Sequence, residues 1–160
     1  MFIRYYLDLA LPIEDAEASL LRSPRTWLPG MAERADARGE RLLAEVGFGR
    51  SGHRLDKMVE ITLGEPVRLG ATTVLPLSWK ATGPERVFPE LEADIELAGL
   101  GRDRTQLAIS ARYRPPLGTL GGFLDRALLH RIAEATLKDF LDHVGEALLR
   151  PADAEVAVTG

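Results

Sequence analysis

The segment Leu91-Glu92-Ala93-Asp94-Ile95-Glu96-Leu97 decides the fold, because apolar and acidic side chains alternate along it without interruption. Strict alternation over this length is typical of a strand with one face buried and the other in water. A period of two also runs through the stretches on either side. We expect these to form further strands: Phe2–Ala10, Leu42–Phe48, Val59–Leu63, Leu75–Ala81 and Leu107–Tyr113.

The breaks between the later stretches indicate how the strands connect. They lie at Gly49–Gly52, Glu65–Gly70, Gly83–Pro84 and Gly99–Asp103, and none is long enough to hold a crossover helix. Consecutive strands should therefore be antiparallel neighbours, with one apolar face and one charged face.

Helices are expected before and after this run of strands. Glu14–Arg22 has an acidic first turn and indicates a short helix, and Ser23-Pro24 starts a second one that fades toward Gly39. Leu120–Leu149 predicts a long C-terminal helix with an apolar stripe in its later half. Its first turns place apolar side chains on a different face. Together these elements predict an α+β domain over 1–150, with a curved antiparallel sheet of six to seven strands under the long helix and a frayed tail over 151–160.

Composition excludes several classes of function. The 160 residues suit one domain, and 46% hydrophobic with 28% charged residues is ordinary for a globular protein. The absence of cysteine excludes disulfides, thiolate zinc sites and cysteine nucleophiles. A net charge of −4 offers no electrostatic footprint for nucleic acid. We find no secretory signal and no apolar run of about 18 residues that would make a transmembrane segment, so we expect a cytoplasmic protein.

Three stretches resemble a known superfamily. They are Leu75-Pro76-Leu77-Ser78-Trp79-Lys80-Ala81, Phe88-Pro89-Glu90-Leu91, and Tyr113-Arg114-Pro115-Pro116-Leu117-Gly118 leading into Leu124-Asp125-Arg126. They are similar to the START-like, Bet v 1-like (SRPBCC) superfamily, in its bacterial polyketide cyclase/dehydrase-like or lipid-transport branch. The resemblance covers Phe2 to Leu149. It implies the helix-grip fold, in which a cavity between sheet and helix binds lipids, sterols, polyketides or other apolar molecules.

A cavity of this kind is physically reasonable here, because a twisted sheet and a straight helix do not stay in contact along their whole length. The Tyr5 and Tyr113 hydroxyls and the Trp79 indole N–H are its candidate polar groups. The alternative is that the same side chains fill a core at native density. The candidate ligand-binding residues are Leu75, Leu77, Trp79, Ile95, Leu107, Ile109, Tyr113, Leu120, Phe123 and Leu124.

Other motifs give little support for chemistry. Gly47-Phe48-Gly49-Arg50-Ser51-Gly52 matches a dinucleotide fingerprint in letters, but a strand follows it where that mechanism needs a helix. His130 and Glu134 lie four residues apart on the expected helix and are interpreted as a solvated surface pair. Two such ligands make a poor metal site, so we expect no metal and no cofactor. The row Glu92, Asp94 and Glu96 is placed on the wet face of the sheet.

The leading hypothesis is a binder or carrier of an apolar small molecule, acting as a monomer or homodimer and without catalysis. The first alternative is a polyketide cyclase or dehydratase that uses the same cavity. It requires a buried titratable group, and the inner-facing positions offer few. The second alternative is an interaction module in which the apolar first turns of the long helix contact a partner.

Overall fold

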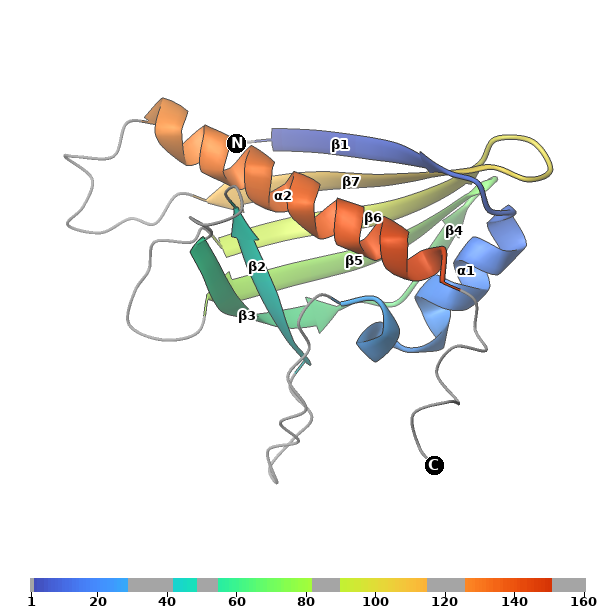
Figure 1. The fold of residues 1–160 in the computed structure, drawn as a ribbon, viewed down its shortest axis with the longest axis horizontal. Coiled ribbons are helices and arrows are strands. Elements are labelled where there is room, and N and C mark those ends of the chain that lie inside the picture. The colour runs from blue at the N-terminus through green and yellow to red at the C-terminus, as the bar shows by residue number, and fades with distance from the viewer. Residues whose placement is uncertain (1, 29–41, 49–54, 82–89, 115–125, 151–160) are drawn as a thin grey trace, which may run out of the picture.

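The computed structural model describes residues 2–28, 42–48, 55–81, 90–114 and 126–150, with side-chain surroundings for 2–28, 59–80, 90–113 and 130–150. The described part is a two-layer α+β structure (Figure 1). Its elements are β1 (Phe2–Leu9), α1 (Ile13–Arg22), the short 3-10 helix η1 (Pro24–Thr26), β2 (Leu42–Phe48), β3 (Leu55–Leu63), β4 (Val67–Leu69), β5 (Thr72–Ala81), β6 (Glu90–Gly99), β7 (Thr105–Arg114) and α2 (Arg126–Leu148).

The seven strands form one antiparallel sheet in the order β1-β7-β6-β5-β3-β2, with β4 paired to β5. The expected antiparallel connections are confirmed, because β2 pairs with β3, β3 with β5, β5 with β6 and β6 with β7. One expectation was wrong: the predicted break Glu65–Gly70 contains β4. This strand is only three residues long, so it offers too few positions for a period of two to show.

The two faces of the sheet differ as the alternation predicted. Along β6, Glu92 and Asp94 are exposed, whereas Ile95 and Leu97 are fully buried on the opposite face. On the outer face, Arg4 of β1 forms an ion pair with Glu96 at 2.9 Å, and Ser110 of β7 donates a hydrogen bond to the same carboxylate at 2.7 Å. The apolar inner face is the one that α2 covers.

Helix α2 crosses the inner face diagonally (Figure 1) and packs directly against β1 at Gly145, near its C-terminal end. A Cβ atom added at Gly145 would lie 2.7 Å from Leu7 Cδ1 and 3.3 Å from Leu9 Cδ2. Glycine costs about 1 kcal/mol relative to alanine inside a helix. Its place here is explained by the close approach of the helix backbone to β1.

The α1–η1 segment closes the opposite end of the sheet from the α2 N-terminus. Trp27, directly after η1, is buried and donates its indole N–H to the Leu20 carbonyl at 2.8 Å. The Glu17 carboxylate of α1 accepts hydrogen bonds from Arg68 of β4 and from Thr73 of β5. These bonds attach the short strand β4 to α1.

The short helix expected over Glu14–Arg22 is confirmed as α1. The second helix, expected from Ser23-Pro24 toward Gly39, was wrong as far as the structure describes it: only the 3-10 helix η1 forms, and it ends at Thr26, while residues 29–41 lie outside the described part. The long C-terminal helix is confirmed as α2 from Arg126, whereas its expected first turns and the tail over 151–160 lie outside the described residues. Within the described part, no helix combines the length and the hydropathy needed to cross a bilayer.

Substitution Gly145→Val should lower the free energy of unfolding by about 1–3 kcal/mol, because the added methyl groups force α2 away from Leu7 and Leu9. Thermal unfolding followed by circular dichroism should then show a melting temperature lower by about 2–4 °C per kcal/mol. The matched control is Glu146→Val, which places the same side chain on the exposed side of the same turn. Equal melting temperatures for the two variants would contradict the close contact at Gly145.

Candidate functional site

A row of three large side chains crosses the inner face at one end of the sheet. Trp79 of β5 is the register partner of Leu91 of β6, and Leu91 is the partner of Tyr113 of β7. All three are buried to 2% exposure or less. Helix α2 meets both ends of this row: Phe140 makes an edge contact with the Trp79 ring at 5.4 Å, and His130 stacks on the Tyr113 ring at 6.2 Å.

The structure brings most of the predicted site residues together. Leu75, Leu77, Ile95, Leu107 and Ile109 are buried on the inner face in the same apolar cluster as Trp79 and Tyr113. Residues 120, 123 and 124, also predicted for the site, lie outside the described part of the chain. Contact of these residues with a ligand stays a prediction.

The indole N–H of Trp79 is a buried donor for which the described residues supply no acceptor. The protein's other tryptophan, Trp27, has its N–H bonded to a backbone carbonyl. A buried donor without an acceptor costs about 1–3 kcal/mol, so most native structures avoid one. The indole N–H of Trp79 is therefore a hydrogen-bond donor that remains available among apolar side chains.

Tyr113 begins a polar chain that leads from the interior to the surface. Its hydroxyl lies 3.3 Å from His130 Nδ1, and His130 Nε2 lies 3.7 Å from the Glu134 carboxylate. With its proton on Nε2, the imidazole accepts from the Tyr113 O–H and directs its own N–H toward Glu134. Tyr113 is 1% exposed, whereas the side chains of His130 and Glu134 are 36% and 55% exposed. A hydroxyl, an imidazole and a carboxylate thus succeed one another, an arrangement that can transfer protons.

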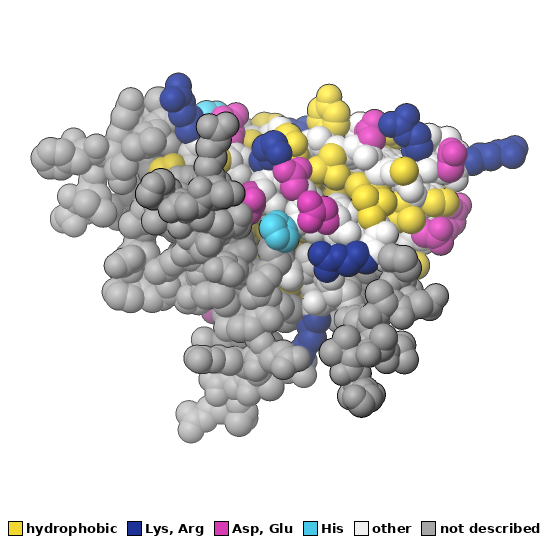
Figure 2. All heavy atoms as spheres, in the orientation of Figure 1, with side chains coloured by type: hydrophobic (Ala, Val, Ile, Leu, Met, Phe, Trp, Pro, Cys, Tyr) yellow, Lys and Arg dark blue, Asp and Glu magenta, His cyan; other side chains and the backbone are white. Residues whose placement is uncertain are grey.

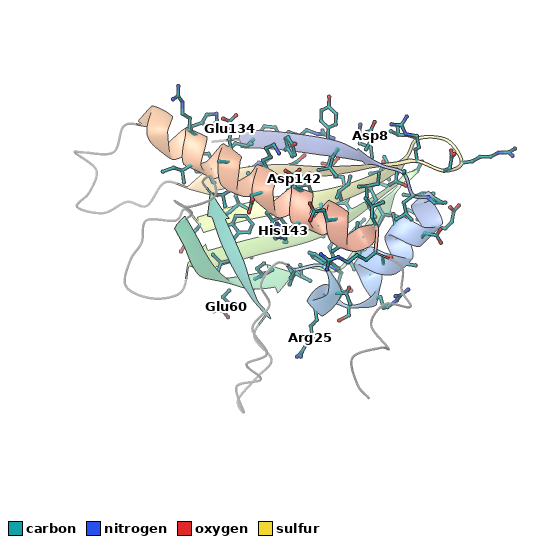
Figure 3. All side chains as sticks on the ribbon, in the orientation of Figure 1. Asp8, Arg25, Glu60, Glu134, Asp142 and His143 are labelled. Carbon is teal, nitrogen blue, oxygen red and sulfur yellow. The ribbon has the colours of Figure 1, made fainter. Side chains whose placement is uncertain are left out.

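The sequence-based interpretation of His130 described only half of its surroundings. The pairing with Glu134 is confirmed, but the contact of His130 with the buried Tyr113 was not foreseen. One signal was available: His130 precedes Ala133 by three residues and Leu137 by seven, so it continues the apolar stripe of α2. Figure 3 shows Glu134 on α2, with Asp142 and His143 further along the helix.

Tyr5, the third predicted polar group, lies under a surface cation. The Lys138 ammonium is 5.4 Å from the centre of the Tyr5 ring. Hydrogen bonding to the Asp142 carboxylate, and secondarily to Tyr5, raises the pKa of Lys138 above its ordinary value. Charged side chains of both signs accompany α2 on its outward side (Figure 2). Tyr5 therefore belongs to the edge of the α2–β1 contact.

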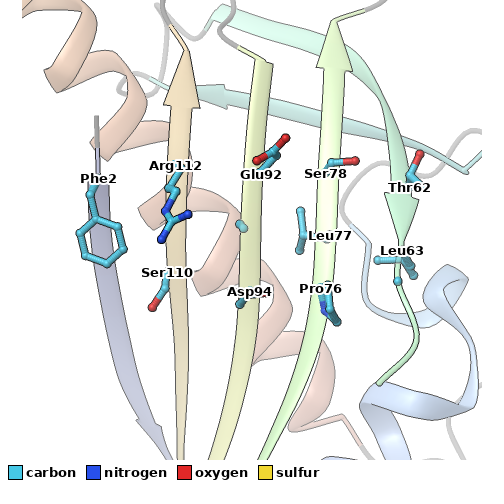
Figure 4. Close-up of a pocket in the computed structure, with 12 residues that line it drawn as sticks. Phe2, Thr62, Leu63, Pro76, Leu77, Ser78, Glu92, Asp94, Ser110 and Arg112 are labelled. Carbon is cyan, nitrogen blue, oxygen red and sulfur yellow. The ribbon is translucent and has the colours of Figure 1, made fainter. Parts of the chain in front are cut away.

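The outer face of the sheet carries an open groove of about 460 Å³, on the side away from α2 (Figure 4). Its charged lining comes from Glu92, Asp94 and Arg112, which the alternation had placed in water. This groove lies on the opposite face of the sheet from the predicted site and shares one residue with it, Leu77. The remaining lining residues are Phe2, Thr62, Leu63, Gly64, Pro76, Leu77, Ser78, Ala93 and Ser110.

Gly47 and Phe48 of the dinucleotide-like motif belong to β2, and the rest of the motif lies outside the described residues. Strand β2 ends at Phe48, and Phe48 pairs with Leu55, the first residue of β3. A strand therefore follows the glycines, as expected, and a phosphate-binding helix N-terminus does not. His53 lies outside the described residues.

The sequence matches no protein-family model and no curated protein. The fold, in contrast, matches solved structures. The conserved protein from Geobacillus kaustophilus superposes with a TM-score of 0.57 at 14% identity, over 92% of this chain and 95% of that one.

Two further solved structures are similar over nearly their full length. Zhui aromatase/cyclase from Streptomyces sp. R1128 has a TM-score of 0.54 at 14% identity, over 100% of this chain and 98% of its own. Ara h 8.0201 has a TM-score of 0.54 at 11% identity, over 93% and 97%. Identities this low establish a likeness of fold alone. The fold expected from the sequence is confirmed at that level: the chain has a helix-grip fold, which it shares with these proteins.

Proposed function

We propose that this protein binds an apolar small molecule between the sheet and α2, at the row Trp79, Leu91 and Tyr113. The observation that carries the proposal is the buried Trp79 N–H, for which the described residues offer no acceptor. A ligand oxygen at this position would remove the cost of the unsatisfied donor. The fold supports a ligand-binding role, since it is shared with an aromatase/cyclase.

The geometry of α2 favours this end of the sheet over the other. Gly145 holds the helix against β1, close to Leu107 of β7. Tyr113 lies six residues further along β7, about 20 Å away at the rise of a strand. There, rings lie between helix and sheet: Phe140 packs against Trp79 and His130 against Tyr113. Rings can rotate or shift to admit a ligand, whereas the leucine methyl groups packed directly on the helix at Gly145 leave no space for one.

The surroundings define the ligand class. The inner wall is apolar and supplies about 25 cal/mol per Å² of ligand surface that it buries. Trp79 and Tyr113 stand two strands apart, roughly 10 Å, so their polar atoms flank the apolar Leu91. The preferred ligand is accordingly a flat or extended hydrocarbon with a carbonyl or ether oxygen near Trp79.

A second candidate function, a cyclase- or dehydratase-type enzyme in the same site, is favoured by the chain Tyr113, His130 and Glu134. In this reaction the Tyr113 oxygen takes a proton from the ligand while its own proton passes to His130 Nδ1. Glu134 stabilises the imidazolium, and the part-exposed His130 exchanges protons with water. The reverse transfer returns a proton to the ligand, so one cycle replaces a ligand hydrogen by one from water.

Two variants of β6 distinguish a ligand site from a filled core. Leu91→Phe should leave the melting temperature unchanged or raised, and should weaken binding of an apolar probe at least about tenfold by occupying the site. Leu97→Phe, the matched control on the same face, should cost about 1–3 kcal/mol, because Leu97 pairs with Leu107 where α2 packs directly on the sheet. If both variants lose stability equally, the row Trp79, Leu91 and Tyr113 is ordinary core.

Trp79→Phe should discriminate between two naphthalene probes. Binding of 2-acetylnaphthalene, which offers a carbonyl oxygen, should weaken about five- to tenfold, the value of one neutral hydrogen bond. Binding of 2-ethylnaphthalene should not change. Ligand-observed NMR measures both dissociation constants, and Trp27→Phe is the control because its N–H is already bonded. Equal weakening of both probes by Trp79→Phe, or no binding of either to the unaltered protein, would contradict the proposal.

The proton-transfer candidate predicts catalysed hydrogen exchange. In D2O the protein should speed deuterium uptake at the acidic C–H positions of 2-tetralone, measured by proton NMR. Tyr113→Phe and His130→Gln should each lower that rate by about 100-fold while changing the probe's dissociation constant little. The control is His143→Gln, since exposed His143 on the same helix contacts the Asp139 carbonyl only, among described partners. If the probe binds but its hydrogen exchange is not catalysed, the binding function stands and the proton-transfer function is excluded.

A further inference from the structure

Strand β1 forms one edge of the sheet. In the described part of the chain β7 is the strand that pairs with it, in an uninterrupted register from Phe2 with Arg112 to Leu9 with Thr105. Figure 1 shows β1 along the upper margin of the sheet, with α2 crossing below it. The outward backbone groups of an edge strand are a template for another strand.

Two usual protections of an edge, a proline and a bulge, are missing from β1. It contains no proline, and its unbroken register leaves no bulge. Its outer face carries two large aromatic side chains, Phe2 at 60% and Tyr6 at 61% exposure. The charges beside them, Arg4 and Asp8, have opposite signs and so do not repel a second copy uniformly.

The order of these side chains is self-complementary. Two β1 strands running antiparallel, with Tyr6 opposite Tyr6 of the second copy, place each Arg4 opposite an Asp8. Phe2 then faces the small residue Ala10. The axis through Tyr6 is a two-fold, so one Arg4–Asp8 pair forms on each side of it and the interface is closed.

Neighbouring registers are less favourable. Moving the axis to Arg4 or to Asp8 brings two like charges face to face, which destabilises a cross-strand pair. Moving it to Tyr5 or Leu7 leaves the charges opposite aromatic or apolar side chains. Opposite-charge and aromatic pairs contribute about 0.2–1 kcal/mol each. The register centred on Tyr6 is therefore the one in which every outer-face pair is favourable or neutral.

Arg4 and Asp8 already form ion pairs within one chain, and these do not prevent two β1 strands from pairing. Arg4 contacts Glu96 at 2.9 Å, and Asp8 contacts Arg104 at 3.2 Å, with both arginines more than half exposed. Exposed pairs of this kind are worth about 0–1 kcal/mol. In the two-fold arrangement Arg4 lies between Glu96 of its own chain and Asp8 of the other, so that the pairs join into a longer network.

We propose that β1 is a homodimerisation edge: two copies pair antiparallel through β1 with Tyr6 on the two-fold axis, continuing the sheet from one copy into the other. The occupant is a second copy of this chain because its charge order matches the edge. This pairing uses the outer margin of the sheet and does not depend on the ligand site. An interface of one strand per copy is small, so the dimer should dissociate on dilution.

Sedimentation equilibrium across a concentration series tests the charge order. Arg4→Asp and Asp8→Arg should each weaken dimerisation at least about tenfold, since each sets two like-charge pairs across the axis. The double variant Arg4→Asp/Asp8→Arg should restore it, because the exchanged charges are again opposite. Circular dichroism confirms that the variants are folded. A strict monomer at all concentrations, or a dimer that none of these substitutions alters, would overturn the proposal.

A disulfide test checks the register independently. The native chain has no cysteine, so Tyr6→Cys introduces a single thiol. On the axis, facing Cβ atoms lie about 4.5–5.5 Å apart, close enough for a disulfide after a small shift. Mild oxidation should link this variant into dimers at least tenfold faster than Leu69→Cys, a control of similar exposure (63%) on β4. Equal rates for the two thiols would show that Tyr6 does not lie on a dimer axis.

Discussion

The contact between Gly145 and β1 determines the arrangement of the two layers. The sheet has a predominantly apolar inner face, and burial of that face requires α2 to lie against it. Because position 145 has no side chain, the helix backbone approaches Leu7 and Leu9 directly at this end. Toward the helix N-terminus, rings lie between the two layers, with Phe140 against Trp79 and His130 against Tyr113. The proposed ligand site lies at this second contact.

Two polar groups of the interior lie at the proposed site. Trp79 keeps an indole N–H among apolar side chains, and Tyr113 connects through His130 to the surface. The first group can only donate, whereas the second chain can both donate and accept. This difference separates the two functional candidates: a binder needs the Trp79 donor alone, and an enzyme also needs proton exchange through His130. Both depend on the same row of register partners across β5, β6 and β7.

The outer face of the same sheet carries charged side chains and an open groove. Its charges bind one another across neighbouring strands, as Arg4 and Glu96 do, and its groove over Glu92 and Asp94 is open and polar. At the β1 margin the same alternation exposes Tyr6 between charges of opposite sign. The alternation of apolar and charged side chains along the strands therefore produces both surfaces. One is the apolar inner face that we propose for a ligand, and the other is the charged margin that we propose for a second copy.

Alternation and short breaks are local properties, and from them the amino-acid sequence predicted most strands, their antiparallel order, the covering helix and the residues that are buried on the inner face. It also indicated the fold-level resemblance. It missed β4, which is too short for a period to show, and the contact of His130 with Tyr113, since these residues belong to different elements. Only the tertiary structure decided the row of Trp79, Leu91 and Tyr113 and the close approach at Gly145. Both depend on strand register and on how the helix crosses the sheet, which are set by packing between segments far apart in the chain.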